Sequence, residues 1–120
     1  MKWLLGLIGV ILMFPSVLAY PKIEYLSIKD KTPYEDAINS IPEQHFEGIN
    51  KIQIYGIYRW GNAGGWFTTN RVIMIDKHSQ DAGLGFKSIL EHELTHNKCY
   101  SKQYGWDLSH TSKCFKEGLI

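Results

Sequence analysis

One short stretch of the chain combines residues that can bind a metal with one that can activate water. His92, Glu93 and His96 follow the order H-E-x-x-H within a segment whose pattern is helical. Positions four apart on a helix lie above one another, so the two imidazoles point to the same place. Two neutral imidazoles can then bind a zinc ion, while Glu93 holds the attacking water without ligating the metal. The pattern predicts a catalytic zinc site, and a solvated helix face that happens to carry two histidines is the simpler alternative.

Two histidines leave such a site one ligand short, because catalytic zinc normally takes three protein ligands and keeps the fourth position for water. His110 is the favoured third ligand. Gly105 is expected to end the helix and turn the chain, and Ser109 then places His110 at the start of a last short helix. From there the imidazole can swing back to the metal.

Two acidic residues remain alternatives for the third ligand. Glu117 falls twenty-one residues after His96, about where a glutamate ligand on a following helix would fall. Asp107 can ligate directly, although a carboxylate here more often accepts the outer N–H of a ligand histidine and fixes its tautomer. The other histidines, His45 and His78, are expected to be exposed loop residues without a role.

The chain has two cysteines, and their spacing follows that of the histidines. Cys99 lies three residues after His96, and Cys114 lies four after His110. If the two histidines meet at one ion, the sulfurs come close, and thiols of exported proteins tend to pair. We therefore predict a Cys99–Cys114 disulfide that holds the third-ligand segment against the helix. The alternative is a thiolate zinc ligand, which would close the site and make it structural.

The first nineteen residues predict a secretory signal peptide. Lys2 precedes an uncharged run from Trp3 to Leu18, and Val17-Leu18-Ala19 provides suitable residues for cleavage after Ala19. The alternative is an uncleaved membrane anchor, for which the run is short and contains Pro15. In either case we expect residues 20–120 to lie outside the cytosol, secreted or in the cell envelope.

The composition favours one small and neutral domain over residues 20–120. The whole chain has 13 Lys and Arg against 12 Asp and Glu, and removal of Lys2 with the leader makes the two counts equal. A neutral chain gives no reason to expect binding to nucleic acid or to an acidic membrane. A domain of this size buries a modest core, so a covalent link would add useful stability.

The hydrophobic pattern predicts an α+β fold with a small mixed sheet. Residues 22–28 alternate between apolar and polar and predict a strand. Thr32 is expected to cap a helix that runs to about Ile41. Residues 49–60 predict a central strand, and the turn at 62–65 indicates that residues 66–76 return beside it as the second arm of a hairpin.

The segment that carries the H-E-x-x-H motif predicts the longest helix. Asp81-Ala82-Gly83 opens it, residues 84–104 form it, and Leu90 and Leu94 mark its core-facing stripe. Ser109 is expected to cap a final helix over residues 110–118.

With these motifs in place, the chain resembles the zincin metallopeptidases. The matching stretches are Gly65-Trp66-Phe67 through Ile75 and Ile89 through Asn97, which include the HELTHN sequence. The chain looks like the minimal zincins of about a hundred residues, which include the minigluzincins. The HELTHN sequence, together with His110 and Phe115, also resembles the SprT-like and WLM-type groups. Those two groups act near DNA inside cells, and we do not carry this role over to a neutral chain that is expected to be exported. Position 102 is Lys, so the third histidine of metzincins is absent.

The resemblance implies a minimal zincin fold and a peptidase that uses Zn²⁺. Glu93 would act as the general base on the attacking water and return the proton to the leaving amine. Residues from Val72 to Asp76 would form an edge strand along which an extended protein or peptide substrate pairs by its main chain. Two functions compete with this expectation. One is a binding or inhibitory module with little turnover, and the other is a structural zinc domain.

Overall fold

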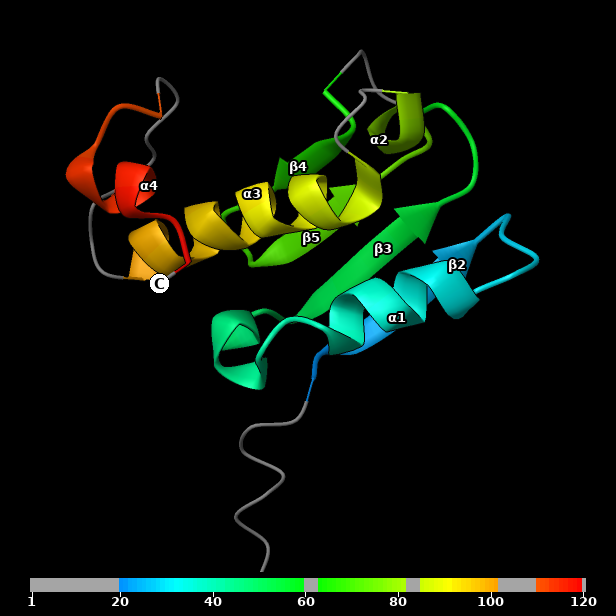
Figure 1. Ribbon diagram of the computed structural model, residues 1–120, viewed down its shortest axis with the longest axis horizontal. Coiled ribbons are helices and arrows are strands. Elements are labelled where there is room, and N and C mark those ends of the chain that lie inside the picture. The colour runs from blue at the N-terminus through cyan, green and yellow to red at the C-terminus, as the bar shows by residue number, and fades with distance from the viewer. Residues whose placement is uncertain (1–19, 60–62, 82–84, 102–109, 120) are drawn as a thin grey trace, which may run out of the picture.

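The computed structural model describes residues 20–59, 63–81, 85–101 and 110–119, and shows a mixed α+β fold (Figure 1). The predicted fold class is therefore confirmed. The leader (1–19), Gly105, Asp107 and Ser109 lie outside the described residues. In chain order the elements are β2 (Lys22–Leu26), α1 (Thr32–Asn39), the 3₁₀ turn η2 (Glu43–Phe46), β3 (Lys51–Tyr55), β4 (Gly65–Phe67), β5 (Val72–Ile75), α2 (His78–Asp81), α3 (Gly85–Ser101) and α4 (Lys113–Glu117).

The four strands form one mixed sheet in the order β2-β3-β5-β4. The strands β2, β3 and β5 run parallel, with Ile23, Ile52 and Ile73 in register across them. The helix α1 connects β2 to β3, as a parallel pair requires a crossover rather than a tight turn.

The predicted hairpin between residues 49–60 and 66–76 is wrong. The second segment folds on itself instead: β4 pairs antiparallel with β5 around a tight turn in which Arg71 N donates to Thr68 O at 2.9 Å. Arg71 adopts a φ of 64°, a left-handed conformation typical of turns. As a result, β5 lies beside β3 in parallel.

This topology also corrects the predicted edge strand. Residues 72–75 form β5, which lies between β3 and β4 and is therefore internal. The strand at this side of the described sheet is β4. Any partner that adds to this side of the sheet would pair with Gly65–Phe67 rather than with Val72–Asp76.

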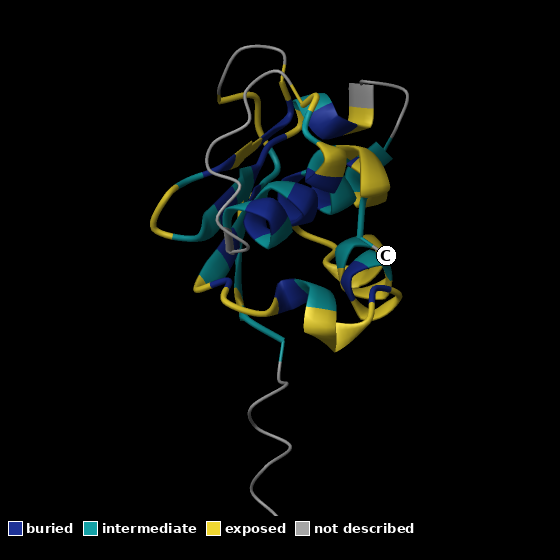
Figure 2. Cartoon of the chain, turned by 90° about the vertical axis from the view of Figure 1, so that its left-hand side faces the viewer, coloured by how far each residue is buried: buried dark blue, intermediate teal, exposed yellow. Residues whose placement is uncertain are grey.

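The helices α1 and α3 lie beside each other on one face of the sheet (Figure 1). The predicted core stripe of α3 is confirmed, since Leu90 and Leu94 are fully buried. Figure 2 shows buried residues gathered where α3 meets the strands, with exposed residues on the outer loops and short helices. The buried hydrophobic core consists of Ile38, Ile41, Phe46, Ile49, Ile52, Ile54, Phe67, Ile73, Ile75, Ile89, Leu90 and Leu94.

The helix ends differ from the predictions in detail. Thr32 is the first residue of α1 rather than its cap, and its backbone N–H donates to Asp30 Oδ1 at 3.0 Å. Ser112, not the predicted Ser109, caps α4 by accepting from Phe115 N at 3.2 Å. Among the described residues, no helix combines the length and apolar character needed to cross a membrane.

A buried asparagine ties α3 to the turn before β3. Asn97 is 2% exposed, and its Nδ2 donates to Glu47 O at 2.9 Å. Arg71 Nη1 donates to Asn97 Oδ1 at 2.8 Å, and the guanidinium lies 5.0 Å from the ring centroid of Tyr100. The amide therefore links three separate segments close to the end of the motif helix.

We predict that Asn97→Ala lowers the free energy of unfolding by about 1–3 kcal/mol, because it removes a hydrogen bond to Glu47 O and one from the charged Arg71 guanidinium. Urea denaturation followed by circular dichroism measures the change. Asn39→Ala, at an exposed position on α1, is the control and should change the stability by less than about 0.5 kcal/mol. Equal effects of the two substitutions would contradict a bridging role for Asn97.

Candidate metal centre

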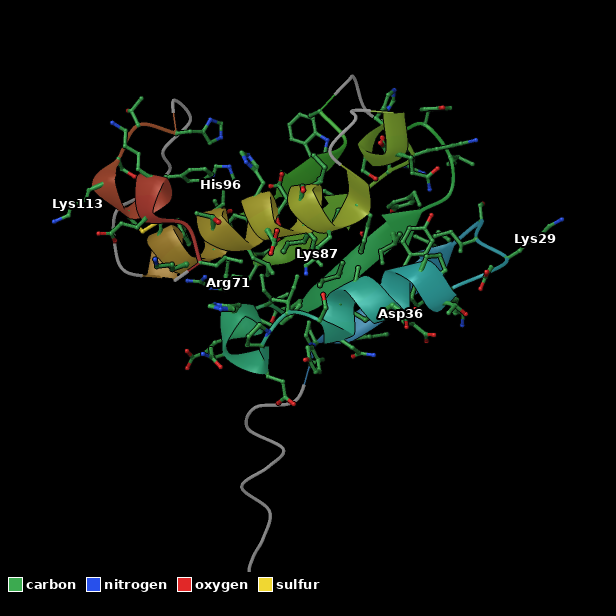
Figure 3. The ribbon with its side chains drawn as sticks, in the orientation of Figure 1. Lys29, Asp36, Arg71, Lys87, His96 and Lys113 are labelled. Atoms are coloured by element: carbon green, nitrogen blue, oxygen red, sulfur yellow. A yellow bond between two sulfur atoms is a disulfide. The ribbon has the colours of Figure 1, made fainter. Side chains whose placement is uncertain are left out.

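Three histidines from two parts of the chain converge at the C-terminal half of α3. His92 and His96 lie one helical turn apart with ring centroids 5.0 Å apart. His110, which precedes α4, brings its Nε2 to 3.1 Å from Nε2 of His96. One ligand atom from each residue lies within 4.8 Å of the other two. In Figure 3, His96 projects from α3 on the side toward α4. The three side chains can thus hold one metal ion.

The position of His110 answers part of the third-ligand question. It is exposed and has a φ of 57°, so the chain turns sharply just before Ser112 caps α4. Glu117, the first alternative, is an exposed residue at the end of α4 and does not belong to the cluster of potential ligands. Asp107 lies outside the described residues. Among the described residues, His110 is the third side chain that the fold brings to His92 and His96.

The ring of Phe115 packs against all three imidazoles. Its centroid lies 5.1 Å from the ring of His92 and 4.7 Å from those of His96 and His110. One apolar side chain thereby restricts three potential ligands at once. Burial, followed by the nearby charge of His110 when protonated, lowers the pKa of His92. A lowered pKa favours the neutral imidazole, which is the form that binds metals.

Glu93 points away from solvent into the interface between α3 and β4. It is 5% exposed, and burial raises the pKa of its carboxyl to about 8 in the metal-free protein. An ideal Cβ placed on Gly65 of β4 would lie 3.1 Å from Glu93 Oε2. The carboxyl group therefore lies directly against the backbone of the edge strand.

A cavity of about 420 Å³ joins Glu93 to the three histidines. Its walls come from the loop before β4, from β4 itself, from α3 and from the segment before α4. The lining residues are Ala63, Gly65, Trp66, Phe67, Ser88, Ile89, His92, Glu93, His96 and His110. A molecule in this cavity would meet both the potential metal ligands and the buried carboxyl group.

The structure joins Cys99 and Cys114 in a disulfide, as the spacing predicts. Both residues are buried, and the bond attaches α4 to the last turns of α3, where Figure 3 draws it in yellow. Lys98 Nζ donates to Gly118 O at 2.6 Å and adds a second link. With both sulfurs in the bond, neither is a thiolate available to a metal. Disulfides are typical of oxidising compartments outside the cytosol.

His78 corrects the expectation of an exposed loop residue. It belongs to α2, is partly buried, and places its Nδ1 3.0 Å from Oδ1 of the buried Asp76. The expectation for His45 is also wrong, because that residue lies in η2 and is partly buried. Neither histidine joins the metal-ligand cluster.

Asp76 is a positioning residue that the motif analysis missed. Its Oδ2 accepts from Arg59 N at 3.0 Å, and its own N–H donates to Gly64 O at 3.0 Å. It therefore anchors both ends of the loop that leads into β4 and the cavity wall. The available signal was an acidic residue directly after the apolar run that forms β5.

Comparison of the chain with protein-family models, curated proteins and solved structures finds no match. The geometry of its own residues is therefore the basis for a functional proposal.

We predict that replacing both Cys99 and Cys114 by serine lowers the free energy of unfolding by about 3 kcal/mol, because the bond closes a loop of fifteen residues. Metal binding should weaken but persist, since the donors are nitrogens. Urea denaturation and metal titration of the same samples measure both quantities. Complete loss of metal binding from a folded double variant would instead identify sulfur as a ligand.

We predict that the contribution of Glu93 makes the metal-free protein less stable as the pH rises from 4.5 to about 8. Over this range the unfolded chain releases the Glu93 proton, whereas the folded chain retains it because its pKa is raised to about 8. The folded state then binds more protons, so the free energy of unfolding falls by up to about 1.4 kcal/mol per pH unit.

Denaturation with urea across this pH range, in the presence of a chelator, measures the slope. Glu93→Gln should flatten it, because the amide does not titrate. Glu43→Gln, at an exposed position, is the matched control and should keep the wild-type slope. An unchanged slope in Glu93→Gln would show that this carboxyl is not the source.

Proposed function

We propose that the protein is a zinc-dependent peptidase that acts outside the cytosol, secreted or in the cell envelope. The convergence of His92, His96 and His110 beside the buried Glu93, in the wall of one cavity, carries the proposal. Three nitrogen donors with an accessible fourth position are typical of catalytic zinc, whereas structural zinc takes four protein ligands. The family resemblance to zincins supports the same reading of the H-E-x-x-H motif.

The spacing of the three histidines supports the choice of zinc. Zn–N bonds of about 2.0–2.1 Å place neighbouring donors about 3.3 Å apart. The separation of 3.1 Å between Nε2 of His96 and Nε2 of His110 is close to that value. The limit of 4.8 Å on the remaining pairs requires small side-chain adjustments at most. Imidazole nitrogens also bind copper, iron and nickel, so the metal content itself tests the choice of zinc.

Within this proposal each residue has a separate task. A bound zinc ion would lower the pKa of the attacking water and polarise the scissile carbonyl. Glu93 would take the proton from that water and deliver it to the leaving amine. The pKa of about 8 is that of the metal-free protein. The positive charge of a bound zinc ion would lower it and favour the carboxylate form that takes a proton from water. Phe115 would hold the three imidazoles in place.

The strand β4 is the proposed docking edge for an extended substrate. Thr68 N donates to Val72 O and Asp76 N donates to Gly64 O, both at 3.0 Å. In an antiparallel ladder alternate residues bond across the pair, so Trp66 also faces β5 with its main chain. The N–H and C=O groups of Gly65 then point away from β5. Gly65 lines the cavity, which favours a polypeptide that pairs with it as an added strand.

The Cys99–Cys114 disulfide supports the proposed location, because such bonds persist in oxidising compartments. The predicted signal peptide would deliver the chain there, and membrane contact would arise only if that leader stays attached. The chain is close to neutral, with a formal net charge of +1, which gives no support to nucleic acid as a partner.

Zinc content and cleavage of labelled casein by the oxidised protein test the proposal together. We expect one zinc per chain, and His110→Ala should lose most of its zinc affinity. Glu93→Gln should retain zinc but cleave at least about 100-fold more slowly, because general acid–base catalysis contributes 10²–10⁴-fold. His45→Ala, outside the cluster, is the control and should match the wild type in both measurements.

Two outcomes would contradict the proposal. A folded wild-type protein without zinc would remove the metal centre and leave a binding module as the better reading. Zinc binding without cleavage, together with unfolding on chelation, would instead indicate a structural zinc domain.

A further inference from the structure

Gly65 of the edge strand lies tightly against α3. Gly65 is buried, and an ideal Cβ built on it would lie 2.6 Å from Cγ2 of Ile89. The ideal Cβ on Gly65 would also lie 3.1 Å from Oε2 and 3.2 Å from Cγ of Glu93. A real Cβ does not tolerate the first distance, and the other two are tight. The absence of a side chain at Gly65 therefore creates the space in which the Glu93 carboxyl group lies.

The requirement at Gly65 concerns space rather than backbone conformation. Its neighbour Gly64 has a φ of 79°, in the left-handed region that favours glycine. Gly65 is not among the positive-φ glycines of the described chain, and its backbone follows the β4–β5 ladder opposite Ile75. A larger residue at position 65 would therefore clash with neighbouring side chains but would not strain the backbone.

The surroundings restrict which group can move to make room. Ile89 is 8% exposed, and a β-branched side chain on a helix has one strongly preferred rotamer. The strand is held from its other side by β5 and by the hydrogen bond from Asp76 N to Gly64 O. Glu93 has a longer and more flexible side chain than Ile89, and this side chain moves more freely than the paired backbone of β4. An added Cβ would therefore displace its carboxyl group or push α3 away from β4.

We propose that Gly65 is a positioning residue for Glu93, and that the missing side chain at this position sets where the carboxyl group faces the cavity. The catalytic consequence of this inference rests on the proposed peptidase function, whereas the contact between Gly65 and Glu93 does not depend on that function. A purely structural role for Gly65 would act through Ile89 alone. The two roles can be separated, because the contacts to Ile89 and Glu93 involve different side chains.

Double-mutant cycles on the metal-free protein test the contact without reference to activity. Gly65→Ala should lower the urea midpoint of unfolding. In a Glu93→Ala background, which removes both Cγ and Oε2, a substantial part of that loss should disappear. An Ile89→Leu background should recover another part, since leucine has a single γ carbon and can leave the Cγ2 position empty. A loss that is identical with and without Glu93 overturns the proposal.

Casein cleavage by the zinc-loaded protein tests the catalytic consequence. The double variant Gly65→Ala/Ile89→Leu is compared with the single variant Ile89→Leu. Both lack Cγ2 of Ile89, the atom that an added Cβ would approach most closely, so we expect both to fold. We expect unchanged zinc content, a KM within about twofold, and a fall in kcat on the order of 100-fold, because a small misplacement of a catalytic group has that effect. If kcat of the double variant equals that of Ile89→Leu, or if only KM differs, Gly65 serves packing or strand position instead.

The two proposals fail in different ways. If the wild type holds no zinc or cleaves nothing, the peptidase function is wrong, and the stability cycles still decide whether Gly65 and Glu93 are coupled. If the wild type cleaves casein but the cycles show no coupling to Glu93, the inference about Gly65 is wrong and the peptidase function stands.

Discussion

The attachment of α4 to α3 is the constraint on which the candidate site depends. Two of the three histidines are fixed by helical spacing alone, but His110 lies fourteen residues beyond His96 and needs an independent restraint. The Cys99–Cys114 bond supplies it covalently, and Phe115, adjacent to Cys114, presses its ring against all three imidazoles. Ser112 caps the start of α4, the helix that carries both Cys114 and Phe115. In a domain with a small core, a covalent link positions a ligand at little cost in buried surface.

The burial of Glu93 opposes stability and favours the proposed chemistry. A carboxyl group in an apolar interface is costly when charged, and its raised pKa of about 8 expresses that cost. Nearby Thr95 and Asn97 are also buried, but their side chains donate hydrogen bonds to Glu91 O and Glu47 O. The helix therefore carries two structural polar residues and one carboxyl group whose environment shifts its titration. Strong perturbation of this kind is concentrated at functional sites.

Local patterns in the sequence predicted much of the site but less of the sheet. The His92–His96 spacing, the Leu90–Leu94 stripe and the cysteine pairing follow from helical periodicity, which is readable over a few residues. The hairpin prediction failed because the parallel pairing of β3 with β5 joins segments separated by a turn and another strand. Sequence alternation does not distinguish a parallel from an antiparallel neighbour for short apolar runs. The roles of Asp76 and Phe115 arise from contacts between elements, which helical periodicity does not predict.

The corrected position of the edge strand changes how the parts of the site relate to one another. Had β5 been the edge, an incoming strand would have paired with a segment that leads into α2, away from the histidines. With β4 at the edge, Gly65 and Phe67 belong to the same wall as Glu93 and His96, and Phe67 stacks on His96 with ring centroids 6.5 Å apart. The short strand β4 thus lies against the helix, the potential metal ligands and the cavity at once. A domain this small has few side chains to devote to a substrate, so within the proposed function main-chain pairing along β4 would hold a substrate beside the three histidines.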